Sequence, residues 1–377
     1  MEIAKTLYFF AGIQGIILSL ILLFSKKHGK TKANKFLAVF LFLFSFNILR
    51  NYFSGYHFNS VKNYPIIYLT TWSFVSFFGP FFYLYVKSLA GLDIHLSKTI
   101  KKHFIIPIIY FFFLFYAGIK GIVTDEQASK LFIERYIYLA FQVFIVFQLL
   151  AYLILSLRII WKYHKRLHNQ FSNIDKLKLN WLFQFTLGLL IIYILWIALM
   201  GGDLLIFKEN IAISDYVINL FWAISAIYVY WIGYYALLKP EIFIKLNSSR
   251  LKTNSSNILL NDQEIKEYKL KLIELLEKEK VFLNGSLTVN QLAKKLKTSS
   301  KITSQVINIG FEKTFYDLIN YYRIEEVKLN LLDASYANYT LEAIALSSGF
   351  KSSTTFNRLF KSYTKQTPNQ YRNTHLK

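Results

Sequence analysis

The chain contains no cysteine among its 377 residues, and its charged residues are few and mostly basic. Without cysteine, disulfides, thiolate metal sites and cysteine nucleophiles are all excluded. No HExxH, GxSxG or phosphate-loop pattern occurs, so the sequence indicates no catalytic, cofactor-binding or metal-binding residues and predicts a protein that is not an enzyme. The formal net charge of +22 predicts polyanionic partners, either phosphates or anionic lipid headgroups.

Ionisable residues are also nearly missing from a series of long apolar runs before residue 240. A bilayer core is crossed by roughly 17–25 apolar residues in a helix. Seven stretches of that kind occur, at residues 7–24, 36–52, 66–89, 104–123, 137–160, 181–201 and 217–238. Residues 1–239 are therefore predicted to form a seven-span transmembrane domain. The scarcity of charge inside the spans argues against ion or proton translocation.

Lys and Arg residues concentrate in alternate loops of this region. The loops near residues 26–35, 87–102 and 158–178 hold roughly twice as many positive residues as the alternating set does. Because positive loops stay in the cytoplasm, the N-terminus is predicted to lie outside the membrane and the C-terminus inside the cell.

Polar and aromatic residues gather in or near the outer half of the predicted spans. They could line an outward pocket for an unknown signal ligand, or they could form interhelical hydrogen bonds and an interfacial belt. The sequence leaves both interpretations open and names no ligand. The residues are Asn47, Tyr52, Trp72, Gln142, Trp196, Asp203, Tyr216, Asn219 and Trp222.

His164 and His168 lie four residues apart in a basic stretch after the fifth span, so they would share one helix face. A metal pair is one interpretation, but no carboxylate or third histidine accompanies them, and the neighbouring Lys and Arg would repel a cation. The sequence favours a basic juxtamembrane helix that lies against anionic lipid headgroups.

The composition changes after Pro240. Residues 240–261 are rich in Asn, Ser and Lys and predict a flexible linker. Residues 262–281 predict an amphipathic connecting helix, whose apolar stripe could form a short homodimer seam or pack on the following domain. The sequence leaves both alternatives open. The stripe consists of Ile265, Tyr268, Leu272, Leu275 and Leu276.

Residues 282–377 contain two helix–turn–helix patterns. In the first, Thr288 and Gln291 form a capping box that opens one helix. Ser299 or Ser300 can cap the next helix, which is expected to bury Ile302, Val306 and Ile309. In a helix–turn–helix this second helix enters the major groove of DNA. Its residues left for DNA are Ser300, Lys301, Ser304, Gln305 and Asn308.

A longer helix over residues 315–332 is expected to connect the two patterns, with a core stripe of Leu318, Tyr322, Leu329 and Leu332. In the second pattern Thr340 caps a helix that buries Ile344 and Ala345, and Gly349 provides the tight turn.

Ser352 or Ser353 then caps the last recognition helix, in which Phe356, Leu359, Phe360 and Tyr363 follow the spacing of a buried face. Asn and Arg side chains suit bidentate contacts with bases, and Lys suits phosphate. The residues predicted to contact DNA from this helix and its end are Ser353, Thr354, Thr355, Asn357, Arg358, Lys361 and Lys365.

Residues 285–372 resemble an AraC-type DNA-binding domain. The resemblance rests on an ordered set of residues: Leu292-Ala293, Asp317 to Glu326, Ile344-Ala345, Gly349-Phe350, Phe356, Phe360-Lys361, Thr367-Pro368 and Tyr371-Arg372. It implies that two recognition helices, at about 300–309 and 353–363, enter successive major grooves on one face of DNA. The sequence departs from the family at Lys365, where glycine is usual, and at Ile302-Thr303, where Leu-Ser is common.

Together these patterns predict an all-α chain: a seven-helix transmembrane bundle followed by a soluble all-α domain with two helix–turn–helix units joined by a linker helix. The function expected of it is a membrane-bound, sequence-specific DNA-binding transcription regulator that senses a signal through its spans. Its partners would be double-stranded DNA and the lipid bilayer, with no cofactor. Two alternatives are a transporter or membrane enzyme with a regulatory DNA-binding domain, and a DNA-binding domain that is only anchored. Any signal is expected to travel through the last span and the helix at 262–281.

Overall fold

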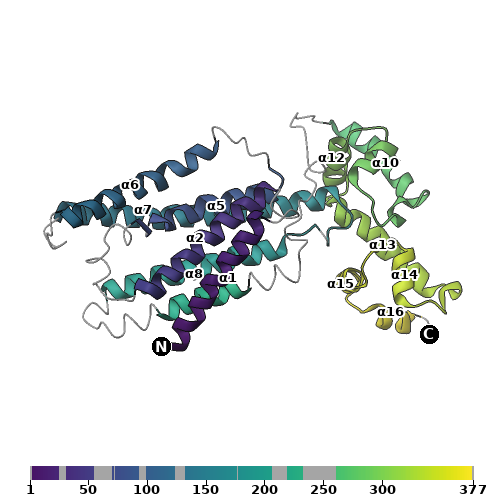
Figure 1. Cartoon of the computed structure of the whole chain (residues 1–377). Coiled ribbons are helices and arrows are strands. Elements are labelled where there is room, and N and C mark those ends of the chain that lie inside the picture. Colours follow the sequence, from purple (N-terminus) through teal and green to yellow (C-terminus); the bar gives the residue numbers. More distant parts are fainter. Residues whose placement is uncertain are drawn as a thin grey trace. The chain divides into compact units, whose positions relative to one another are not determined.

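The computed structural model describes residues 2–24, 31–54, 70–71, 73–92, 99–123, 132–175, 177–205, 219–231 and 260–375. Over these residues the secondary structure is helical, apart from one isolated antiparallel β-bridge between Phe171 and Thr288 (Figure 1). The predicted all-α class is therefore confirmed. The chain forms two compact units: Met1–Trp161 with Asn180–Arg250, and Lys162–Leu179 with Leu251–Lys377.

The first unit is built from long apolar helices. They are α1 (Glu2–Phe24), α2 (Lys32–Ser54), α5 (Val75–Leu89), α6 (Thr99–Val123), most of α7 (Phe132–Gln170) and α8 (Asn180–Leu205), and residues 219–231 are helical as well. Within the described residues, five segments are long and apolar enough to cross a membrane: Thr6–Phe24, Lys32–Arg50, Lys101–Ile119, Val143–Gln170 and Asn180–Ala198. The predicted stretch at 66–89 contains α5, and much of the one at 217–238 lies outside the described residues. Five of the seven predicted spans thus correspond to segments that are long and apolar enough to cross a membrane.

Small residues let α1 and α2 pack closely. A Cβ atom added to Gly15 would lie 1.9 Å from Ser45 Oγ, and one added to Gly12 would lie 2.5 Å from Leu49 Cγ. Such close approach at small residues is common between helices in membranes. Tyr8 of α1 also donates a hydrogen bond to Asn219 Oδ1 at 3.2 Å, so Asn219 forms the interhelical bond that the sequence offered as one alternative.

The second unit consists of shorter helices with well-formed N-caps. They are α10 (Asp262–Glu277), η3 (Val281–Leu283), α11 (Val289–Lys295), α12 (Ser300–Gly310), α13 (Phe315–Leu332), η4 (Ala334–Tyr336), α14 (Leu341–Ser347), α15 (Ser353–Thr364) and α16 (Pro368–His375). The predicted capping box of Thr288 and Gln291 is present, and Thr340 caps α14. Where the sequence left two candidates, Ser299 caps α12 and Ser352 caps α15.

The amphipathic helix α10 packs onto its own domain. Its buried residues Ile265, Leu272, Leu275 and Leu276 face α12 and η3, and three of them join a core cluster with Leu292 and Leu318. Of the two alternatives for this stripe, the packing one is therefore observed.

Several predicted core positions are wrong. In α12 the predicted Val306 is buried, but Ile302 is only half-buried and Ile309 is 54% exposed, while Thr303 and Ile307 are buried as well. In α13, Leu329 is 66% and Leu332 is 38% exposed. This helix contacts η3 and α12 on one part and α14, α15 and α16 on another, so its buried face changes along its length and no single stripe describes it. Tyr363 of α15 is also predicted to be buried, but it is 38% exposed, and its hydroxyl donates a hydrogen bond to the Asp317 carbonyl.

Candidate nucleic-acid interface

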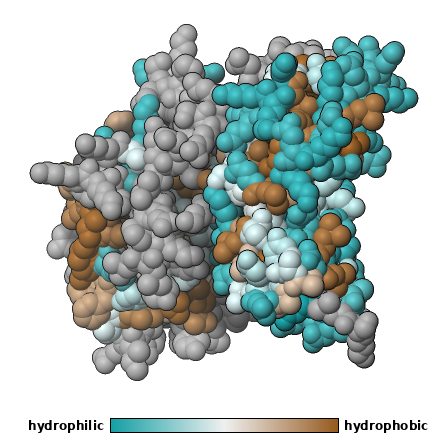
Figure 2. Space-filling model, turned by 90° about the vertical axis from the view of Figure 1, so that its right-hand side faces the viewer, coloured by the Kyte–Doolittle hydropathy of each residue, from teal (hydrophilic) through white to brown (hydrophobic). Residues whose placement is uncertain are grey.

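The helices α12 and α15 each present a polar face and bury an apolar one. The helix α12 buries Thr303, Val306 and Ile307, and α15 buries Phe356, Leu359 and Phe360. On the face shown in Figure 2, hydrophilic side chains cover most of the C-terminal unit.

All twelve residues that the sequence assigns to DNA remain unburied, as a DNA-reading face requires. Six of them are exposed: Asn308, Thr354, Asn357, Arg358, Lys361 and Lys365. The other six are half-buried: Ser300, Lys301, Ser304, Gln305, Ser353 and Thr355.

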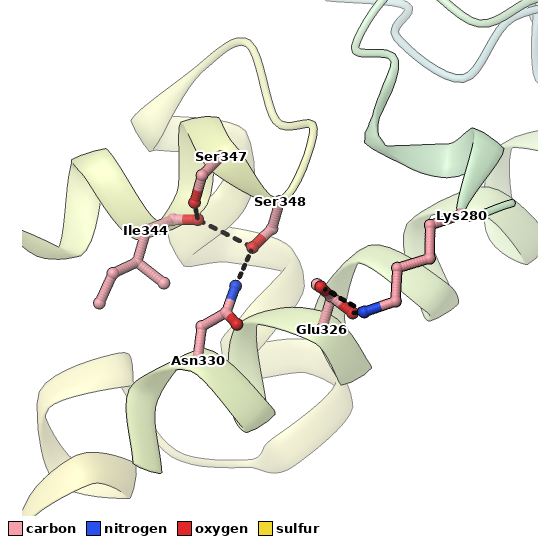
Figure 3. Close-up of polar contacts among 6 residues, drawn as sticks. All are labelled: Lys280, Glu326, Asn330, Ile344, Ser347 and Ser348. Atoms are coloured by element: carbon pink, nitrogen blue, oxygen red, sulfur yellow. Dashed lines mark hydrogen bonds and ion pairs between the residues drawn. The ribbon is translucent and has the colours of Figure 1, made fainter. Parts of the chain in front are cut away.

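The helix α13 packs against helices of both helix–turn–helix units, namely α12 in the first and α14 and α15 in the second. At one end, Asn330 Nδ2 donates to Ser348 Oγ at 3.2 Å, and Ser348 in turn donates to the Ile344 carbonyl at 2.8 Å, which fixes the end of α14 (Figure 3). Nearer its middle, Glu326 pairs with Lys280 at 2.9 Å, next to η3 (Figure 3). Because α13 packs against both α12 and α15, it sets the separation of these two helices, and fixed separation is what two successive major grooves require.

Gly349 forms the turn before α15, as predicted. Its φ of +90° lies in the region that side chains rarely adopt. A Cβ atom there would also lie 2.6 Å from the Phe282 carbonyl oxygen and 3.0 Å from Arg323 Nε. The turn therefore needs glycine for both its backbone conformation and its space.

Lys365 occupies the position at which the resembling family usually has glycine. Its backbone is left-handed, with φ 63° and ψ 2°, and its N–H closes α15 by bonding the Lys361 carbonyl at 2.9 Å. The turn geometry thus survives the substitution, at the conformational cost that a Cβ atom incurs in this region.

Arg323 joins several segments of the domain through hydrogen bonds. The sequence does not predict this role, although Arg323 is among the residues that carry the family resemblance. Its side chain is only 1% exposed, and its guanidinium N–H groups donate to the carbonyls of Phe282, Asn284 and Ser172, to Asn320 Oδ1 and to Ser172 Oγ, at 2.8–3.2 Å. Burial lowers the pKa of Arg323 to about 10, which leaves it charged at neutral pH. All five acceptors are neutral oxygens, so hydrogen bonds alone compensate the desolvation.

Ser172 belongs to the connection between α7 and α8, which the second unit includes. It is 2% exposed. Its N–H and Oγ both donate to the Leu287 carbonyl, at 3.2 and 2.7 Å, and its carbonyl also accepts from Asn320 Nδ2 at 3.3 Å. Neighbouring Phe171 and Ile174 are buried too, at 8% and 0% exposure. In the sequence, the apolar residues of this basic loop, Phe171, Ile174, Leu177 and Leu179, are the local sign of packing.

A second set of contacts reaches α15 itself. Thr355 Oγ1 donates to the carboxylate of Asp175, and Arg358 Nη2 donates to Tyr316 Oη at 3.3 Å. The His168 ring meets Tyr316 edge-on, with 4.8 Å between ring centroids. His164 Nε2 accepts from the Leu179 N–H at 3.2 Å, so both histidines contact protein. Among the described residues no group of three metal-ligating side chains occurs.

The comparison with protein families concerns the C-terminal region. The family model described as a helix-turn-helix domain matches residues 292–374. Residues 292–374 form a helix–turn–helix domain of the AraC type. This helix–turn–helix domain contains α12 and α15, together with the connector α13.

The relatives carry the same domain in much longer chains. An uncharacterized HTH-type transcriptional regulator of Staphylococcus aureus strain COL is 32% identical over 119 residues, which are 32% of this chain and 15% of the relative. A protein of the same description from strain MRSA252 is 41% identical over 73 residues, 19% of this chain and 9% of the relative. The chain thus covers less than a sixth of these curated relatives. No solved structure matches it.

Proposed function

We propose that the chain is a membrane-bound, sequence-specific transcription regulator, in which α12 and α15 bind double-stranded DNA and the apolar helices sense a signal. The observation that carries the proposal is the pair of capped helices with unburied polar faces, held by one connector inside a matched helix–turn–helix domain. Arg358 and Asn357 suit base edges, and Lys361 and Lys365 suit phosphates.

Support for a bacterial inner-membrane location comes from the first unit. It contains candidate spans such as Lys101–Ile119, and large apolar side chains such as Phe112 and Phe147 are more than 60% exposed. Side chains of this kind suit lipid better than water. The excess of Lys and Arg in the loop at 158–178 supports a cytoplasmic position for that loop and for the helix–turn–helix domain. The division into spans 1–239, linker 240–261, connecting helix 262–281 and domain 282–377 is part of the same proposal.

Support for sensing comes from a cavity inside the first unit. It measures about 90 Å³ and is lined by apolar and aromatic side chains, among them Phe40, Leu189, Trp196 and Trp222, with Asn47 as a polar group. Three of the residues that the sequence offered as pocket-lining, Asn47, Trp196 and Trp222, thus share this cavity. A small apolar or aromatic signal molecule is the class of ligand that such a lining accepts.

A homodimer remains within the proposal, because two copies would read a longer DNA site. The buried face of α10 is already covered by α12 and η3, so a dimer interface would use another surface of the chain.

Selection from a random-sequence duplex library with the full-length chain in lipid nanodiscs tests the function. We expect a defined motif to be enriched, with affinity that falls steeply as salt rises. Substitution Arg358→Ala should relax the motif at one position, whereas Lys361→Ala should weaken binding to all sequences alike. If no duplex were retained even at low salt, the proposed function would be wrong.

A reporter comparison separates sensing from anchoring. The full-length chain is compared with its C-terminal unit fused to an unrelated single span, under many growth conditions. We expect the full-length chain alone to change its output between conditions. Identical output from the two proteins in every condition would leave anchoring as the role of the apolar helices.

A further inference from the structure

The connection between α7 and α8 is bonded to the same helix that is proposed to read DNA. We call residues 171–175 and 177–178 the docking arm. Ser172 anchors the docking arm to Arg323, Asn320 and Leu287, as described above. From that anchor the chain reaches α15, where Asp175 accepts a hydrogen bond from Thr355.

We propose that the docking arm is an intramolecular partner of the second recognition helix, and that the arm and DNA compete for the N-terminal turn of α15. The inference rests on the proposed function and adds a mode of regulation to it. In a helix–turn–helix, the N-terminal residues of the second helix point toward the base edges. Thr355 lies in that first turn, and the docking arm occupies it.

The carboxylate of Asp175 opposes DNA at this turn of α15. Duplex DNA carries about one negative charge per 1.7 Å of its axis, so a carboxylate bonded to the reading helix repels it. Asp175 is the acidic residue that the docking arm places there.

The docked state also contains an opposing force. Lys178 of the docking arm lies close to Arg358, and burial together with this like charge lowers the pKa of Lys178, while Asp175 acts in the opposite direction. Burial of the Lys178 ammonium and its repulsion by Arg358 oppose docking, and the attraction of Asp175 favours it.

Chain connectivity gives the docking arm a direct link to the apolar helices. The arm begins one residue after α7 ends at Gln170 and finishes two residues before α8 begins at Asn180. Both helices contain candidate spans. Any rearrangement between α7 and α8 therefore changes the separation of both ends of the arm. This route is separate from the route through the last span and α10 that the sequence suggested.

A reversible disulfide tests the proposal in the full-length chain in nanodiscs. Phe171 and Thr288 are paired in an antiparallel bridge, in which the backbone hydrogen bond joins their neighbours Ser172 and Leu287. In such a non-hydrogen-bonded pair the two Cα atoms lie about 4.5 Å apart. That separation suits a disulfide between cysteines at the two positions. The chain has no other cysteine. We expect oxidised Phe171→Cys/Thr288→Cys protein to bind the selected duplex about tenfold more weakly than the reduced protein, a usual degree of coupling between sites. Each single-cysteine variant, treated with the same oxidant, is the control.

Each outcome has a definite meaning. Equal binding by the oxidised and reduced forms overturns the proposal, and tighter binding by the oxidised form would show instead that the docking arm helps to hold DNA. If wild-type protein and the reduced variant both fail to retain any duplex at low salt, the proposed function itself fails.

A second variant keeps the test independent of the disulfide. Asp175→Asn should increase duplex affinity severalfold in the full-length chain, because it removes the repelling charge from α15. Glu267→Gln, which removes one negative charge from the exposed face of α10, is the matched control and should leave affinity near that of the wild type. Equal affinities for the two variants would count against the docking arm.

Discussion

Arg323 donates two hydrogen bonds to Ser172, a residue 151 positions earlier in the chain, through Nη1 to its carbonyl at 3.2 Å and through Nη2 to its Oγ at 3.1 Å. A buried guanidinium with neutral acceptors depends on each of them, because an unsatisfied buried donor costs more than a typical hydrogen bond contributes. The helix–turn–helix domain is thus completed by a segment that lies outside its sequence boundaries.

Substitution Ser172→Ala should loosen the domain. It leaves an N–H of Arg323 without its hydroxyl acceptor, at a cost of about 1–3 kcal/mol. All tryptophans precede residue 232, so tryptophan fluorescence does not report on this unit. Hydrogen exchange read by mass spectrometry should show faster exchange in peptides around residues 281–287 and in α13. Ser335→Ala, at an exposed serine of η4, is the control and should exchange like the wild type.

Substitution Gly349→Ala should destabilise the second helix–turn–helix unit by about 1–3 kcal/mol, since it combines a strained φ with contacts below 3 Å to two carbonyl oxygens. The same measurement of hydrogen exchange should reveal it in peptides from η3 and α14. Gly310→Ala provides the contrast, because a Cβ atom there would meet its nearest neighbours at 3.5 Å. Equal exchange in both variants would contradict the role given to Gly349.

Substitution Lys365→Gly should stabilise α15 by about 1 kcal/mol, because glycine adopts the left-handed backbone of this position without the cost that a Cβ atom carries. Lys365→Ala keeps that cost while it removes the same charge, so it should not gain stability. If Lys365 contacts a phosphate, both variants should lower the slope of log affinity against log salt by about 0.9. A phosphate contact and a purely structural role therefore give different results with the same two proteins.

Local chemistry explains which parts of the fold could be predicted from the sequence. The caps at Thr288 and Thr340 and the turn at Gly349 depend on residues a few positions apart, and each was correctly assigned. The twelve residues assigned to DNA also proved unburied, since amphipathic spacing is a local property. Their contacts with DNA remain a prediction.

Long-range packing explains what could not be predicted. The core of α13 was assigned to one stripe, but neighbours on different sides bury Ile324 and Val327 and leave Leu329 exposed. The basic stretch around His168 is predicted to lie against lipid headgroups, which stays a prediction, and the contact of the His168 ring with Tyr316 follows from no local pattern. No pattern in the sequence pairs residues separated by more than one hundred positions, so the partners of Arg323 were not accessible.

The cavity in the first unit yields the last prediction, which concerns sensing and not DNA affinity. Substitution Leu189→Phe on α8 should fill part of this small cavity, because Leu189 lines it and is only 8% exposed. Ile191→Phe makes the same kind of enlargement on the same helix at a side chain that is 59% exposed. We expect the Leu189 variant to lose the response of a reporter to growth conditions while duplex affinity in nanodiscs stays at the wild-type value. The Ile191 variant should keep both properties, because its added ring atoms lie outside the bundle. A response that survives in both variants would mean that the cavity does not hold the signal.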